Sequence, residues 1–312
     1  MSFRGVVALS GGVGGAKLAL GLSRVLPPDE LLVVCNTGDD FEHLGVSVSP
    51  DIDTVMYTLA GLANLELGWG RRDETWSFME TIEALGGESW FRLGDRDLAV
   101  HVERTRRLAA GESLSAVTAE FCTRLGIAAR VVPMTDARVR TKVRTDDGWI
   151  EFQDYFVRQQ CRPVVRELVF EGATKAKPQA DFLAALKGGG VRAVVICPSN
   201  PFISVEPILA MRGVRKALAQ CGAPVVGVSP IIGGRAVKGP TAKMMAELGL
   251  DASAAGVAAR YGELLDGFVV DHEDAGSVLL PEIAVAQTLM KSIEDRENLA
   301  RAVMAFVDRL WG

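Results

Sequence analysis

The sequence predicts an α/β protein with a Rossmann-like, mostly parallel sheet and helices on both of its faces. Continuous apolar runs alternate with helical segments along the chain of 312 residues, and strands that are apolar throughout lie in sheets covered on both sides. Four of these runs end in glycine-rich or polar loops, which is where open α/β sheets bind their ligands. Glycine is also abundant, at 33 residues against 13 prolines, as expected where backbone approaches a ligand closely.

The predicted strands are short and largely apolar. They cover residues 5–9, 31–35, 129–134, 192–197, 224–228 and 268–270. Helical periodicity occupies residues 16–22, 53–62, 95–109, 113–125, 178–186, 212–220 and 292–310. An Asp-Gly turn at residues 147–148 predicts a hairpin of residues 138–144 and 149–152, and residues 164–170 predict an edge strand.

The length of the chain allows either two domains or one large α/β unit. Between residues 67 and 127 strand-like runs disappear, helical periodicity dominates, and three of the five tryptophans occur. We therefore predict a single α/β nucleotide-binding domain over residues 1–312 with a helical insertion at about 67–127. The aromatic side chains of this insertion could hold a flat ligand, although packing in the core is the simpler interpretation of any one tryptophan.

Composition excludes several classes of protein. A net charge of −5 gives no basic face for nucleic acid, so we expect no nucleic-acid partner. The five cysteines include no CxxC pair and the three histidines never pair at metal-ligand spacing, so neither a zinc site nor a disulfide framework is predicted. Because no cleavable signal and no stretch of roughly 20 apolar residues occurs, we expect a cytoplasmic protein without a membrane partner.

A glycine-rich loop at residues 10–17, Ser-Gly-Gly-Val-Gly-Gly-Ala-Lys, follows the first strand. Its amides and the helix that follows can bind phosphate. It is not a Walker A loop, because Lys17 lies between Ala16 and Leu18, and it lacks the third glycine of the dinucleotide fingerprint. A phosphate or nucleotide site is the favoured interpretation, and a tight turn that needs glycine for its backbone is the alternative.

Acidic residues follow the second strand. Asp39 and Asp40 come directly after it, and Asp51 and Asp53 open the next helix, where one of them could act as a cap. Carboxylates beside phosphates repel unless a cation lies between them, and Mg²⁺ is usually held by one or two carboxylates and substrate phosphates. We predict a Mg²⁺ site that uses at least one of these four acids, with surface acids or caps as the alternative.

Seven motifs, taken together, resemble the 2-phospho-L-lactate transferase family, the CofD-type enzymes that build the deazaflavin coenzyme F-420. They occur in order and span nearly the whole chain, at residues 10–17, 36–40, 49–54, 93–97, 152–156, 198–201 and 229–233. The resemblance implies phosphoryl transfer from a guanosine diphosphate ester of a three-carbon acid to the ribityl terminal hydroxyl of the deazaflavin Fo, with release of GMP. It also implies a homodimer, which is common in the family.

The same resemblance assigns roles to individual residues. Asp53 and Arg92 are implied as catalytic residues and Fo contacts, with Trp90 against the flat deazaflavin under the insertion. The resemblance places Asp53 near the Mg²⁺, and together with Asp39 and Asp40 of the acidic loop it makes up the predicted set of Mg²⁺ ligands. The implied guanosine diphosphate pocket consists of Ser10, Gly11, Gly12, Gly14, Lys17, Asn36, Ser199, Asn200, Ser229 and Gly233.

Two other functions remain open at this stage. One is a nucleotide-sugar-binding regulatory protein of the CofD-like branch, and the other is a dinucleotide-dependent oxidoreductase. The three-carbon acid is also open, because family members use phospholactate, phosphoenolpyruvate or phosphoglycerate donors.

Overall fold

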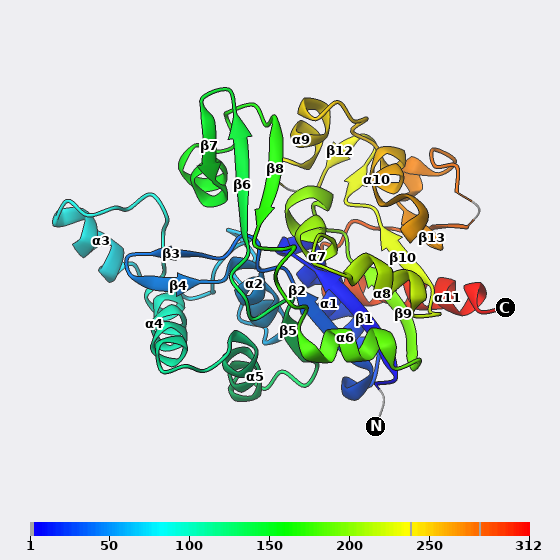
Figure 1. The fold of residues 1–312 in the computed structure, drawn as a ribbon, viewed down its shortest axis with the longest axis horizontal. Helices are drawn as coiled ribbons and strands as arrows, with labels where there is room; N and C mark the ends of the chain where they lie inside the picture. The colour runs from blue at the N-terminus through cyan, green and yellow to red at the C-terminus, as the bar shows by residue number, and fades with distance from the viewer. Residues whose placement is uncertain (1–2, 238, 281) are drawn as a thin grey trace.

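A seven-stranded sheet forms the centre of the protein, and its strands follow the order β14-β13-β10-β9-β1-β2-β5 (Figure 1). The computed structural model describes residues 3–237, 239–280 and 282–312. Each neighbouring pair of strands in this sheet is parallel. The strands are β1 (Gly5–Ser10), β2 (Leu31–Cys35), β5 (Arg130–Pro133), β9 (Val191–Ile196), β10 (Val225–Val228), β13 (Gly267–Val270) and β14 (Ile283–Val285). The predicted parallel sheet is confirmed.

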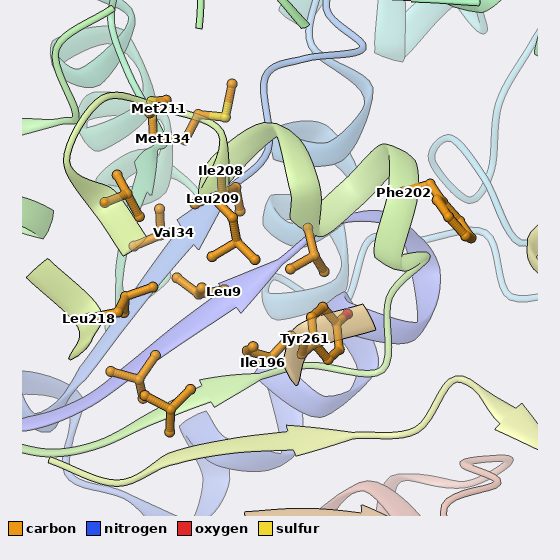
Figure 2. Packing of buried hydrophobic residues seen from close by; sticks show 14 of the residues in the cluster. Leu9, Val34, Met134, Ile196, Phe202, Ile208, Leu209, Met211, Leu218 and Tyr261 are labelled. Atoms are coloured by element: carbon orange, nitrogen blue, oxygen red, sulfur yellow. The ribbon is translucent and has the colours of Figure 1, made fainter. Parts of the chain in front are cut away.

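The first strand, β1, lies in the middle of this sheet. Leu9 of β1 is paired with Val34 of β2 on one side and with Ile196 of β9 on the other. These three side chains point to the same face and pack together in one buried cluster (Figure 2). Every residue of β1 is buried, as its continuous apolar run predicts for a strand covered on both faces.

Helices cover both faces of the sheet, as predicted. The cluster shown in Figure 2 receives side chains from one set of helical segments. This set comprises α6 (Ala180–Lys187), the π-helical turn η3 (Pro201–Val205), α7 (Glu206–Leu209), α8 (Val214–Gln220), α9 (Thr241–Glu247) and α10 (Ala254–Tyr261). The opposite cluster receives side chains from α1 (Gly12–Val25), α2 (Pro50–Leu59), α5 (Leu114–Arg124) and α11 (Ile293–Leu310).

Two helices begin earlier than their periodicity predicts. Helix α1 begins at Gly12, so the glycines of the predicted loop form its first turn. Helix α2 begins at Pro50, because proline has a backbone angle suited to the first turn of a helix and no N–H to leave unpaired there. Asp51 and Asp53 are therefore within the first turn of α2.

The chain between α2 and β5 carries helices α3 (Ser77–Ala84), α4 (Asp95–Ala109) and α5. Helix α4 packs against a short hairpin of β3 (Phe41–His43) and β4 (Val46–Val48), whereas α3 lies at the outer end of the molecule, far from the central sheet (Figure 1). Neither β3 nor β4 was predicted, because strands of three residues give no periodic signal.

The predicted hairpin is confirmed as β6 (Arg140–Thr145) and β7 (Gly148–Glu151), which are antiparallel. The predicted edge strand is β8 (Glu167–Glu171), and it pairs with β6 in a separate three-stranded sheet. The remaining short elements are η1 (Pro28–Glu30), η2 (Asp154–Arg158), β11 (Ile231–Ile232), β12 (Arg235–Ala236), η4 (Gly262–Leu264) and η5 (His272–Asp274). Within the described residues, no helix is both long enough and apolar enough to cross a membrane.

Candidate functional site

Three of the four strand-end loops meet at the carboxyl edge of the sheet. The amide of Gly11, after β1, donates to Oγ of Ser199, after β9, at 3.3 Å. The side-chain amide of Asn36, after β2, donates to the carbonyl of Ile203 at 3.1 Å. The fourth loop follows β10, which is the neighbour of β9 in the sheet. The amide of Gly233 in this loop donates to Oδ2 of Asp274 at 3.1 Å and not to one of the other three loops.

The glycine-rich turn is in close contact with these neighbours. A Cβ at Gly14 would lie 2.2 Å from the carbonyl oxygen of Pro198, so this position requires glycine. The amide of Gly12 donates to Oδ1 of Asp51 at 2.5 Å, so an amide predicted for phosphate contacts a carboxylate. Lys17 donates to the carbonyl of Met290 at 2.9 Å, toward the segment that precedes α11.

Asp39, Asp40 and Asp51 form a buried acidic cluster beside this turn. The side-chain amide of Asn36 lies 2.9 Å from both Asp39 Oδ1 and Asp51 Oδ2, and Ser49 donates to Asp40 Oδ2 at 2.8 Å. Burial raises the pKa of Asp40 to about 7 and that of Asp51 to about 6. Burial, together with the other two acids, raises the pKa of Asp39 well above its usual range. This cluster favours binding of a proton or another cation.

Asp53 lies in a different environment from the acidic cluster. Both of its carboxylate oxygens bond the guanidinium of Arg104, a residue of α4 that is 1% exposed. His101 Nδ1 lies 3.2 Å from the same guanidinium, and its Nε2 lies 3.3 Å from Oδ1 of Asp97. Because a guanidinium only donates hydrogen bonds, Nδ1 of His101 can act only as an acceptor in the contact with Arg104. Tyr57 donates to the same Asp97 oxygen at 2.6 Å.

A cavity of about 420 Å³ opens beside the acidic cluster. Its wall includes Asp39, Asp40, Trp90, Arg138, Arg140 and Arg158. Arg138 lies just before β6, Arg140 begins this strand, and Arg158 lies in the π-helical turn η2 between β7 and β8 of the small three-stranded sheet. Acidic and basic side chains therefore line the same space.

Trp90 and Arg92 belong to different aromatic clusters although they are close in sequence. Trp90 lines the cavity, with the Arg158 guanidinium 4.6 Å from its ring centroid. Arg92 is exposed and stacks on Trp76 with a centroid distance of 4.4 Å. The structure thus places Trp90 beside the acidic cluster, whereas Arg92 lies on Trp76 in a separate aromatic cluster.

Several other predicted site residues also have local contacts. Asn200 caps η3 by accepting from the amide of Phe202 at 2.9 Å, and Ser229 Oγ accepts from the amide of Ile231 at 3.1 Å. Ser10 differs from these, since its buried hydroxyl finds no hydrogen-bond partner within the described part of the chain.

Neither Arg104 nor Arg140 was predicted as a site residue, and no role was predicted for His101. The sequence does contain a signal for Arg104 and His101, because Asp97, His101 and Arg104 are spaced to lie on one face of α4. Arg140 gives no such signal, because only the fold brings the start of β6 to the end of β2.

The fold and the position of this site define an α/β protein of the doubly wound class, whose ligands bind beyond the carboxyl ends of its strands. The sequence matches the family described as 2-phospho-L-lactate transferase CofD over residues 6–308. The chain belongs to this family, as its motifs predicted, and its membership makes it a transferase of the CofD type.

Relatives of high similarity span nearly the whole chain. A phosphoenolpyruvate transferase of Streptomyces griseus is 42% identical and covers 98% of this chain and 99% of its own. A 2-phospho-L-lactate transferase of Methanocaldococcus jannaschii is 37% identical with the same coverage of 98% and 99%. Among solved structures, a UPF0052-family protein of Bacillus halodurans has the same fold, with a TM-score of 0.62 at 14% identity over 97% of this chain and 99% of its own.

Proposed function

We propose that this protein transfers a phosphorylated three-carbon acid from a guanosine diphosphate ester to the ribityl terminal hydroxyl of the deazaflavin Fo. The hydroxyl oxygen forms a bond to the phosphorus that carries the acid, and the bond from this phosphorus to the GMP oxygen breaks. The hydroxyl loses its proton and GMP leaves. Such transfers depend on positioning and on charge stabilisation. The observation that carries the proposal is the cavity where Asp39 and Asp40 lie together with Arg138 and Arg140.

The three-carbon group that we propose is the enolpyruvyl group, so the transferred unit is that of phosphoenolpyruvate. The relative from Streptomyces griseus, named a phosphoenolpyruvate transferase, is 42% identical to this chain. The relative from Methanocaldococcus jannaschii, named a 2-phospho-L-lactate transferase, is 37% identical. The greater similarity to the first supports this choice of donor.

Asp39 and Asp40 would hold a Mg²⁺ ion in this proposal. Three buried carboxylates in one cluster repel one another, and Oδ1 of Asp40 is buried with no hydrogen-bond partner among the described residues. Oxygen donors of this kind suit Mg²⁺, which when bound neutralises charge on the phosphoryl oxygens. Asp53 would orient the acceptor hydroxyl, because each carboxylate oxygen has two lone pairs and Arg104 leaves some of them available.

Two of the other predicted contacts, the glycine-rich turn and Trp90, are assigned roles in this proposal. The turn around Gly11, Gly12 and Gly14, with Ser199 beside it, would contact the guanosine diphosphate part. Trp90 would lie against the deazaflavin ring, for which its position in the cavity wall offers an aromatic face.

Turnover with a mixture of donors tests this function. The protein is incubated with Fo, Mg²⁺ and equal amounts of the guanosine diphosphate esters of enolpyruvate and lactate, and GMP is measured together with the mass of the deazaflavin product. We expect GMP release and a product lighter by two hydrogen atoms than the lactate product. Absence of GMP together with unchanged Fo fluorescence would instead support the nucleotide-sugar-binding or oxidoreductase alternative.

A further inference from the structure

Arg140 is a cavity-lining cation without a carboxylate partner. It begins β6, is half-buried, and donates from one guanidinium nitrogen to the carbonyl of Val139 at 2.8 Å. No ion pair joins it to any acid within the described residues. The next two basic residues on the same face of the strand behave differently, because Lys142 lies 3.3 Å from Glu151 and Arg144 lies 3.0 Å from Glu167.

Charges of both signs act on Arg140, those of three acids and that of Arg138. Asp40 is the carboxylate whose charge acts on it most strongly, followed by Glu42 and Asp39. Burial lowers the pKa of Arg140, the positive charge of Arg138 also lowers it, and together these effects exceed the opposite effect of the acids. A half-buried guanidinium whose one hydrogen bond among the described residues goes to a carbonyl has several N–H groups available to an incoming anion.

We propose that Arg140 binds an oxyanion of the donor, either a phosphate oxygen or the carboxylate of the three-carbon acid. The proposal rests on the proposed function for the identity of the donor. The planar guanidinium presents paired donors that match the oxygens of phosphate and carboxylate groups. Arg140, Asp39 and Asp40 line the same cavity, so an anion held by Arg140 lies beside the carboxylates that would hold a cation. Arg140 thereby selects a donor that carries an anionic group at this position.

Binding of GDP and of the donor ester to the wild type and to Arg140→Gln tests this role. Affinity for GDP is measured by calorimetry with Mg²⁺ present, and the KM for the enolpyruvyl ester is measured in turnover with Fo. We expect Arg140→Gln to lower the affinity for GDP, to raise the KM for the ester, or to do both, by about ten- to a hundredfold. This is the size expected for loss of a hydrogen bond between charged groups. The matched control Arg144→Gln removes a cation from the same face of β6 outside the cavity, and it should leave both values unchanged.

The two measurements separate the two possible anions. A weaker affinity for GDP, which has phosphates and no carboxylate, identifies phosphate as the contact. An unchanged GDP affinity with a raised KM for the ester identifies the carboxylate. Unchanged values in both would overturn the proposal, because Arg140 would then only offset the charge of Asp40.

Two further controls distinguish a failure of Arg140→Gln to fold from a failure of the proposed function. The thermal midpoint and the Fo affinity of Arg140→Gln should match those of the wild type. If this variant does not fold, Arg140→Lys is used, which keeps the charge but loses the paired donors, and wild-type affinity in this variant would overturn the paired contact. If the wild type itself does not turn over any guanosine diphosphate ester, the proposed function fails, while the comparison of GDP affinities still tests Arg140.

Discussion

The guanidinium of Arg104 binds both carboxylate oxygens of Asp53, and the two side chains are only 1% and 6% exposed. Arg104 lies on α4 and Asp53 on the first turn of α2. The pair therefore attaches α4 to the helix whose Asp51 contacts the glycine-rich turn.

Replacement of Arg104 by methionine should strongly destabilise the protein. The variant leaves the carboxylate of Asp53 buried without its partner, which for a buried ion pair costs about 3–5 kcal/mol of unfolding free energy. Urea denaturation measures this loss. The control Arg107→Met removes a more exposed arginine of the same helix, paired with Glu112, and should change the stability little. Equal losses in the two variants would contradict a special role for the buried pair.

Asp53→Asn should lower turnover by roughly a hundredfold, the size expected when a group that orients a reacting hydroxyl is lost. The amide keeps the shape of the side chain but not its charge. Full turnover at saturating Mg²⁺ would show that Asp53 has no part in the reaction.

Stability can be separated from catalysis with the double variant Arg104→Met/Asp53→Asn. Because neither charge then remains buried alone, this variant should unfold at higher urea than Arg104→Met. Its turnover should stay as low as that of Asp53→Asn. Recovery of both properties would mean that Asp53 acts only through the stability of the fold.

The acidic cluster should make the metal-free protein less stable as pH rises. Burial raises the pKa of Asp40 to about 7 and that of Asp51 to about 6, above the value of about 3.9 in an unfolded chain. The folded state therefore holds protons that the unfolded state releases, and the stability from these groups is lost between about pH 4 and about pH 7. Asp40→Asn should be more stable than the wild type at about pH 8 and similar to it at about pH 4.

Thermal unfolding of the two proteins across this pH range measures the effect. Asp29→Asn, at an exposed position, is the control and should follow the wild type. Added Mg²⁺ should raise the melting temperature of the wild type more at about pH 8 than at about pH 5, because protonated carboxylates bind metal poorly. A stabilisation by Mg²⁺ that is equal at both values would exclude these acids as its ligands.

Gly14→Ala should disturb the turn that the proposal assigns to guanosine diphosphate. Alanine normally favours a helix over glycine, but its Cβ here would lie 2.2 Å from the carbonyl oxygen of Pro198. We expect a loss of about 1–3 kcal/mol in unfolding free energy, as for overpacking, together with weaker GDP binding. Val13→Ala, in the same turn, should change both values little, and a stabilising Gly14→Ala would contradict the close contact.

Much of the fold could be predicted because it follows local rules. The central strands are continuous apolar runs, and the turn of residues 146–148 specifies the hairpin of β6 and β7. The third strand of that sheet, β8, could be placed at an edge but not assigned to its sheet, because pairing with β6 is set by packing across a distance in the chain. The last strand, β14, has only three residues, Ile283–Val285, and gave no signal.

The acidic cluster was predictable because its residues follow a strand or open the next helix. Asp39 and Asp40 come after β2, and the structure brings them together with Asp51 through contacts of Asn36. The partner of Asp53 was not predictable, because Arg104 belongs to a helix 51 residues further along the chain. Their pairing depends on how α4 packs on the hairpin of β3 and β4.

The central position of β1 also determines the order in which the sheet can form during synthesis. Its partner β2 follows at once, but its second partner β9 begins only at Val191. A nascent chain therefore has more than half of its residues outside the ribosome while the backbone N–H and C=O groups along one edge of β1 are still unpaired. Such edges associate with other chains, and pairings between distant segments form slowly. Fragments that end before β9 should aggregate, and the full chain should depend on chaperones until β9 has been made.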